Sequence, residues 1–204
     1  MNDVGQPGID NPICNSCGLY VGKNTPFHGL EGNPHPKILV IGEAVCCDGD
    51  VTGSIFKGAS GKMIKELLRS CGYGDCSAFL NIVRCHPEGN KLSTRVIKAC
   101  SQFLWRDLLI MRSHLELTIL LGKTAFDVVI GVKEKQWNDY MWILNTETDN
   151  PNAILLCYTC YHPAYIMRRR SLEAQWKIGL KDALDHVPRD ITIKGWDYSN
   201  WTIE

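Results

Sequence analysis

Residues 37–44 read KILVIGEA, and this stretch decides the fold class. Four aliphatic residues, Ile38 to Ile41, run without interruption into Gly42, which is typical of a parallel strand buried on both faces. Similar apolar runs lie at 78–84 (AFLNIVR), 117–122 (LTILLG) and 153–158 (AILLCY). Between and after them, helical spacing of apolar residues predicts helices at 61–71, 94–113 and about 123–130, and a helical region from 164 to about 186. This alternation predicts an α/β fold with a parallel sheet and helices on both faces.

Parallel sheets of this kind bind ligands beyond the carboxyl ends of their strands. The predicted loops at those ends are 43–59, 85–93, 122–124 and 159–167. Unusual residues concentrate in three of these four loops. We therefore expect the functional site at this edge of the sheet.

The composition fits one domain spanning 1–204, with an irregular N-terminal region at 1–36 and a C-terminal extension at 187–204. Lys plus Arg and Asp plus Glu both number 22, so a nucleic-acid binder with this balance needs a local basic patch. We find neither a signal segment nor an apolar run of about 18 residues. The expectation is a cytoplasmic monomer without a membrane partner.

Ten cysteines in a chain expected in the cytosol favour metal or cluster ligation over disulfides. Cys14 and Cys17 form a C-x2-C pair, and Cys85 and Cys100 complete a candidate four-thiolate site. Thiolates suit zinc or an iron–sulfur cluster. The wide spacing of the second pair favours a cluster modestly, while zinc and unligated cysteines remain alternatives. The role of the adjacent pair Cys46–Cys47 stays open.

Six motifs occur in an order that resembles a known family. They are C-x2-C at 14–17, GEA at 42–44, G-x-x-F-x-G-x-x-G at 53–61, NIVRCHPEGN at 81–90, Cys100 and HPAY at 162–165. Together they resemble the iron–sulfur (family 4) uracil-DNA glycosylases over about residues 14–180. The resemblance implies a three-layer α/β/α fold with a four-stranded parallel sheet. It also implies a structural [4Fe–4S] cluster held by Cys14, Cys17, Cys85 and Cys100.

Cutting an N-glycosidic bond builds positive charge on the sugar and negative charge on the departing base. The enzyme therefore needs a pocket for the flipped base, a donor to the base and a positioned water. The resemblance implies that His162 donates to the base O2 and that Glu43 positions water or supports the cation. It implies a base pocket that contains Phe56, which stacks on the base, and Asn81, which pairs with it, together with Ala44 and Gly49.

DNA contacts are expected on either side of this pocket. Ser60 and Gly61 begin a predicted helix whose free N–H groups can hold a phosphate, and Lys57 adds a charge. Either Ile166 or Met167 can fill the gap left by a flipped base. Further candidates for phosphate contacts are Arg168, Arg169, Arg170, His86, Asn90 and Lys91.

The loop GEAVCCDGD departs from the family, which usually has GEAPG followed by acidic residues. Gly49 falls where the family has an acidic side chain that crowds the C5 position of the base. Room at C5 suggests a hypothesis in which the substrate is a 5-substituted pyrimidine, hydroxymethylated or glucosylated, and the protein acts in defence against phage. This hypothesis is an alternative to the main prediction, a monofunctional DNA glycosylase that hydrolyses the N-glycosidic bond of a flipped pyrimidine, uracil or a 5-modified base, and leaves an abasic site. Two further alternatives are a catalytically inactive binder of modified or damaged DNA and a zinc-stapled protein unrelated to DNA.

Overall fold

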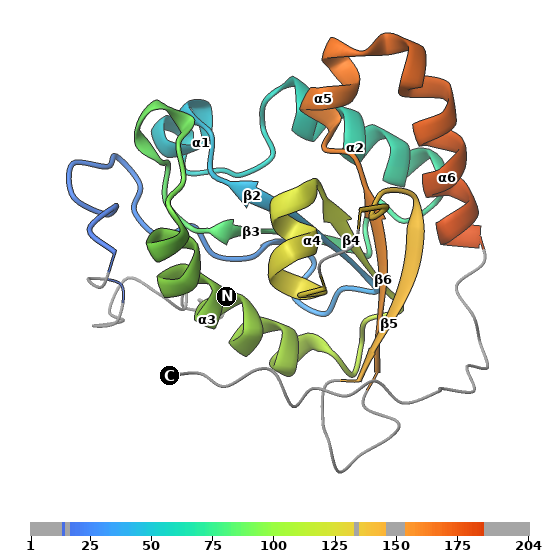
Figure 1. Cartoon of the computed structure of the whole chain (residues 1–204), viewed down its shortest axis with the longest axis horizontal. Helices are drawn as coiled ribbons and strands as arrows, with labels where there is room; N and C mark the ends of the chain where they lie inside the picture. The colour runs from blue at the N-terminus through green and yellow to red at the C-terminus, as the bar shows by residue number, and fades with distance from the viewer. Residues whose placement is uncertain (1–13, 15–16, 133–134, 146–153, 186–204) are drawn as a thin grey trace.

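The structure is a computed structural model that describes residues 14, 17–132, 135–145 and 154–185. Within these ranges the chain forms a six-stranded sheet in the order β1-β3-β2-β4-β6-β5 (Figure 1). The strands are β1 (Glu31–Gly32), β2 (Ile38–Ala44), β3 (Ser77–Val83), β4 (Leu117–Leu121), β5 (Tyr140–Asn145) and β6 (Ile154–Cys160). The predicted C-terminal extension lies outside the described residues.

The four predicted strands form the centre of this sheet. β2 pairs in parallel with β3 and with β4, and β4 pairs in parallel with β6. The prediction of a four-stranded sheet was incomplete, because β1 and β5 add antiparallel edges to β3 and β6. β1 has only two residues, too few for an apolar run. β5 does carry an apolar run, Tyr140 to Leu144, which sequence reasoning missed inside a polar, mixed segment, and its partial burial is that of an edge strand.

Helices cover both faces of the sheet and make the predicted three layers. Ile38 and Val40 of β2 face one cluster with α2 (Ala59–Ser70), α5 (Pro163–Arg168) and α6 (Glu173–Asp185). Leu39 and Ile41 face the other cluster, with α3 (Thr94–Met111) and α4 (Lys123–Val129). This alternation follows from the twofold side-chain period of a strand, and Figure 1 shows the two groups of helices on opposite sides.

The carboxyl ends of the four central strands meet at one edge, as expected. A short helix, α1 (Cys47–Thr52), follows β2, and a 3-10 turn at Glu88–Asn90 follows β3. The part of the chain that the structure describes contains no helix long and apolar enough to cross a membrane.

The loop before α2 depends on a glycine. Gly61 is buried, and a Cβ at this position would lie 2.1 Å from the carbonyl oxygen of Phe56 and 2.5 Å from its Cα. Phe56 itself has a φ of +52°, a left-handed conformation that costs energy for a residue with a side chain. Gly61 therefore allows the backbone of Phe56 to pack directly on α2.

We predict that Gly61→Ala destabilises the protein by about 3 kcal/mol, because the new methyl group meets backbone that cannot move aside. Chemical denaturation measures the change in unfolding free energy. Gly58→Ala is the matched control, since the nearest atom to a Cβ there, Oδ2 of Asp48, is 3.9 Å away. Equal stability of the two variants would contradict the packing role of Gly61.

Candidate active site

The catalytic pair predicted from the sequence lies at the carboxyl edge of the sheet. Glu43 is exposed near the end of β2, and His162 follows β6 and caps α5. The charge of Glu43 acts on the imidazole of His162, which places the two side chains in one neighbourhood. Between their strands, Thr124 at the start of α4 donates a hydrogen bond from Oγ1 to Oε2 of Glu43, 2.5 Å away.

His162 has a defined hydrogen-bonding state. Its Nδ1 accepts a hydrogen bond from the backbone N–H of Ala164 at 3.1 Å, so Nδ1 carries no proton. The proton of the neutral ring therefore sits on Nε2, which is free to donate. Burial lowers the pKa of His162 below its ordinary value, Glu43 opposes this change and Arg168 adds to it. The ring is thus a neutral donor at neutral pH.

Two of the predicted base-binding residues, Asn81 and Phe56, come together beside Gly42, the residue before Glu43. Gly42 pairs with Asn81 across β2 and β3, and a Cβ at Gly42 would lie 2.5 Å from Oδ1 of Asn81 and 2.8 Å from Cζ of Phe56. Asn81 is buried, and no described residue forms a hydrogen bond with its side-chain amide. Phe56 is half-buried and packs on Phe79, with ring centroids 5.2 Å apart. The structure therefore brings Asn81 and Phe56 together, as predicted.

Gly42 was missed as a site residue, although it stands in the stretch that decides the fold. Its missing side chain is what lets the amide of Asn81 and the ring of Phe56 approach. Ala44, the next predicted pocket residue, is half-buried at the end of β2 and pairs with Val83. It lies at the correct edge of the sheet.

The expectation that Gly49 leaves open space is wrong. Gly49 lies inside α1 and is buried, and a Cβ there would be 2.8 Å from Cγ1 of Val45 and 3.2 Å from the carbonyl oxygen of Ser54. The prediction assumed an extended loop, whereas the helical turn directs this position into the protein. Cys46 and Cys47 of the same segment are exposed.

Asp50, on the same short helix, anchors α1 to the N-terminal loop. Its carboxylate accepts hydrogen bonds from both the backbone and the side chain of Asn24 and from the backbone N–H of Thr25, at 3.0–3.3 Å. Burial opposes ionisation, but these hydrogen bonds hold the pKa of Asp50 below its ordinary value. This acidic residue therefore stabilises the loop that follows Glu43.

The four predicted ligand cysteines lie in one neighbourhood. Burial raises the pKa of Cys85 to about 11, and the charges of Cys14 and Cys17 raise it further. Burial likewise raises the pKa of Cys100 to about 12, and the charges of Cys85 and Cys17 add to the effect. The thiols influence one another although they come from a loop, a strand end and a helix.

Two of these sulfurs also accept hydrogen bonds from the backbone. The N–H of Phe27 donates to Sγ of Cys85, and the N–H of Arg84 donates to Sγ of Cys100, both at 3.3 Å. Among the described residues, no three Cys, His, Asp or Glu side chains stand close enough to hold a single metal ion. In a [4Fe–4S] cluster each thiolate binds a different iron, so its ligands are spread more widely. The four cysteines fit such a cluster in donor type and neighbourhood.

The predicted DNA contacts divide into two groups. Ile166 is fully buried in the core, so its prediction as a wedge was wrong; the periodicity of a six-residue helix is too short to tell its inner from its outer face. Met167 is half-buried and lines a groove between α2 and α6. Ser60 is half-buried, while the predicted basic contacts are exposed, namely Lys57, Arg168, Arg169 and Arg170. Arg169 stacks on the ring of Tyr165, and Arg170 forms an ion pair with Glu173.

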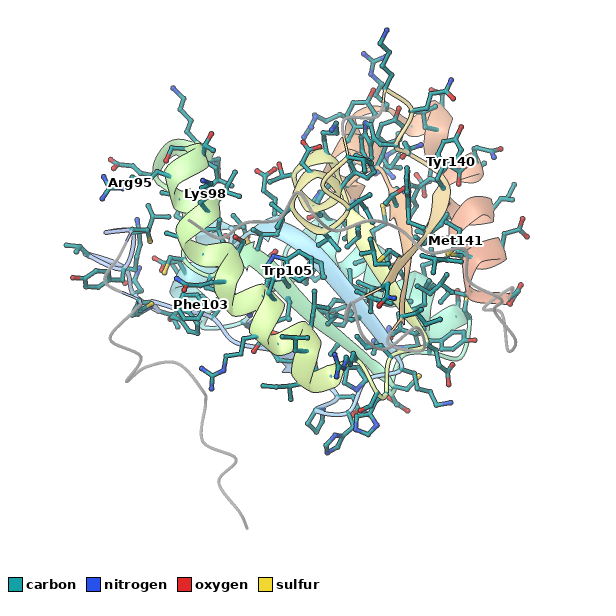
Figure 2. The ribbon with its side chains drawn as sticks, turned by 60° about the horizontal axis from the view of Figure 1, so that its bottom comes forward. Arg95, Lys98, Phe103, Trp105, Tyr140 and Met141 are labelled. Carbon is teal, nitrogen blue, oxygen red and sulfur yellow. The ribbon has the colours of Figure 1, made fainter. Side chains whose placement is uncertain are left out.

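A further basic pair lies on α3. Figure 2 shows Arg95 and Lys98 projecting from the N-terminal end of this helix, and both are exposed. Because α3 follows the loop after β3, this end lies toward the same edge of the sheet as Glu43. Their spacing of three residues places both on one face of the helix, so they are further candidates for phosphate contacts.

Comparisons with known proteins identify the family of this chain. The family model "Uracil DNA glycosylase superfamily" matches residues 30–182. A type-4 uracil-DNA glycosylase from Archaeoglobus fulgidus is 26% identical over 172 residues, covering 82% of this chain and 85% of the relative. One from Thermotoga maritima is 27% identical over 176 residues, with coverage of 83% and 85%, and one from Saccharolobus solfataricus is 29% identical over 202 residues, with coverage of 92% and 88%.

These matches confirm the resemblance drawn from the motifs. The family model spans the sheet, the Glu43–His162 pair and the pocket of Asn81 and Phe56. The chain belongs to the uracil-DNA glycosylase superfamily, and it is an enzyme of the DNA glycosylase class.

Proposed function

We propose that this protein is a monofunctional uracil-DNA glycosylase that hydrolyses the N-glycosidic bond of a flipped uracil and leaves an abasic site. One observation carries the proposal: an imidazole fixed as an Nε2–H donor lies in the same neighbourhood as a carboxylate held by hydrogen bonding. This pair supplies the donor for the leaving base and the carboxylate for water and the cationic sugar.

In this mechanism the flipped base stacks on Phe56, and the amide of Asn81 pairs with its imide edge. The bond between C1′ and N1 breaks, and its electron pair leaves with the base. Nε2–H of His162 donates to the base O2, where negative charge develops. The Glu43 carboxylate stabilises the positive sugar and orients a water, whose oxygen bonds to C1′ as its proton passes to the carboxylate.

The surrounding surface supports binding of the DNA backbone. In this proposal exposed basic residues contact the phosphates, and Met167 is the candidate wedge for the gap in the base stack. The basic residues are Lys57, Arg95, Lys98, Arg168 and Arg169. Ser60 adds a hydroxyl near the first turn of α2. A chain with a net charge of zero would then bind DNA through these local basic residues.

We further propose that Cys14, Cys17, Cys85 and Cys100 hold a [4Fe–4S] cluster with a structural role. Bound there, the cluster supplies a rigid crosslink between the N-terminal loop, the end of β3 and α3. The mutual influence of the four thiols and the two N–H···S hydrogen bonds support this assignment.

Uracil is favoured over a bulky 5-substituted pyrimidine. The room expected at Gly49 motivated the modified-base hypothesis and a role in phage defence, and that position is packed against Val45. Modified bases are therefore comparison substrates in the first experiment below. DNA binding without base release is the outcome that an inactive binder would give.

The first prediction concerns catalysis. The wild-type protein should release uracil from DNA, and Glu43→Gln and His162→Gln should each lower the single-turnover rate by about 10²–10⁴-fold. Mass spectrometry identifies the base released from duplexes that contain uracil, hydroxymethyluracil or glucosylated hydroxymethylcytosine. Glu116→Gln is a matched control, because this exposed carboxylate pairs with Lys37 at the opposite edge of the sheet. Release of modified bases without uracil would contradict the proposed substrate.

The second prediction concerns the protonation of His162. A lowered pKa means that the ring stays neutral until the pH falls below the ordinary value of 6.5. Protonation would place an N–H on Nδ1 opposite the N–H of Ala164 and break the hydrogen bond between them. The stability that this hydrogen bond gives the folded protein is therefore lost as the pH falls below about 6.5. Nitrogen-15 NMR should find the Nε2–H tautomer at pH 7, with the signal assigned by its loss in His162→Gln. A midpoint above 6.5 would rule out the neutral donor.

The third prediction concerns the cluster. Protein purified without oxygen should be brown and contain about four iron atoms per chain. Cys85→Ser and Cys100→Ser should each lose most of this iron and the visible absorbance. Cys46→Ser, an exposed thiol outside the proposed ligand set, should retain both. A colourless wild-type protein that contains zinc would overturn the assignment.

A further inference from the structure

Thr124 makes a contact with the catalytic carboxylate that the resemblance does not assign. Its Oγ1 donates to Oε2 of Glu43 at 2.5 Å, across 81 positions of sequence. No other described residue forms a hydrogen bond with this carboxylate. The side chain of Glu43 is exposed and has three rotatable bonds, so one short hydrogen bond decides much of its orientation.

Thr124 belongs to a turn that the rest of the fold holds in place. Gly122, between β4 and α4, donates its N–H to the carbonyl oxygen of Cys160 at 2.8 Å. The next residues of α4 are anchored in the core, since Ala125 and Phe126 are both fully buried. The hydroxyl of Thr124 is therefore presented from a rigid element, as positioning of a reacting group requires.

The same turn also adjoins the second catalytic residue. Gly122 has a φ of +91°, and a Cβ there would lie 3.4 Å from Cβ of His162. One turn thus contacts Glu43 through the hydroxyl of Thr124 and packs against His162 through Gly122. Sequence reasoning singled out no residue in this short loop, because threonine in the first turn of a helix is ordinary.

We propose that Thr124 is a positioning residue for Glu43 in base excision. Its hydrogen bond occupies Oε2 and fixes the plane of the carboxylate, which leaves Oε1 to orient the attacking water. The inference rests on the proposed function, because it assigns the two oxygens of Glu43 to different tasks in that reaction. Thr124 itself touches neither the base nor the sugar in this scheme.

The test compares Thr124→Val, which keeps the shape and removes the donor, with Thr124→Ser, which keeps the donor. The measurements are the single-turnover rate of uracil release and the Kd for a duplex containing uracil. Thr124→Val should lower the rate about tenfold to a hundredfold, the effect of losing one hydrogen bond to a charged group, with Kd within about twofold of wild type. Thr124→Ser should restore the rate to within about threefold of wild type.

A double-mutant cycle separates positioning from a structural role. In the Glu43→Gln background, Thr124→Val should cause no further loss of rate, because the group it orients is already gone. An additive loss, or equal losses in Thr124→Val and Thr124→Ser, would overturn the proposal. A wild-type rate in Thr124→Val would overturn it while leaving the proposed function intact. Absence of base release by wild type would overturn the proposed function, and the inference with it.

Discussion

Parallel hydrogen bonding of β2 to both β3 and β4, and of β4 to β6, is the constraint on which the rest of the structure depends. Since parallel strands end at the same edge, residues 43, 81, 124 and 162 meet although they span most of the chain. The site residues come from separate segments of the chain. They stay together only while the register of the strands is kept. Burial of β2 and β3 on both faces fixes that register energetically.

The cysteine neighbourhood extends this constraint to segments outside the sheet. Cys85 lies two residues after the end of β3, and Cys100 lies on the buried face of α3. The guanidinium of Arg84, the residue before Cys85, is buried and forms an ion pair with Asp107 at 2.6 Å. A backbone hydrogen bond also joins the N-terminal loop to the end of β3: the N–H of His28 donates to the carbonyl oxygen of Arg84 at 2.8 Å. The N-terminal loop is thereby tied to β3.

Sequence reasoning identified what depends on short-range pattern and motif. The four central strands followed from uninterrupted apolar runs, and Glu43 and His162 from motifs that end such runs. It failed for residues whose role depends on the direction in which the side chain points in the folded protein. Ile166 and Gly49 were misplaced because a helix of six residues has too little periodicity to show which face is buried. Gly42 and Thr124 were missed because their importance lies in what an adjacent strand brings near them.

The hydrogen bond from Ala164 to Nδ1 of His162 has a consequence for evolution. Serine, threonine and aspartate can cap a helix as Nδ1 of His162 does. None of them has a group like Nε2–H, which donates a hydrogen bond from the far side of the same ring. A substitution at position 162 would therefore remove the proposed donor to the base and loosen the start of α5, which carries Met167 and Arg168. One residue thus serves both as the proposed donor and as the cap of α5, so a mutation at this position affects both roles at once. Position 162 is where divergence within such a lineage should be slowest.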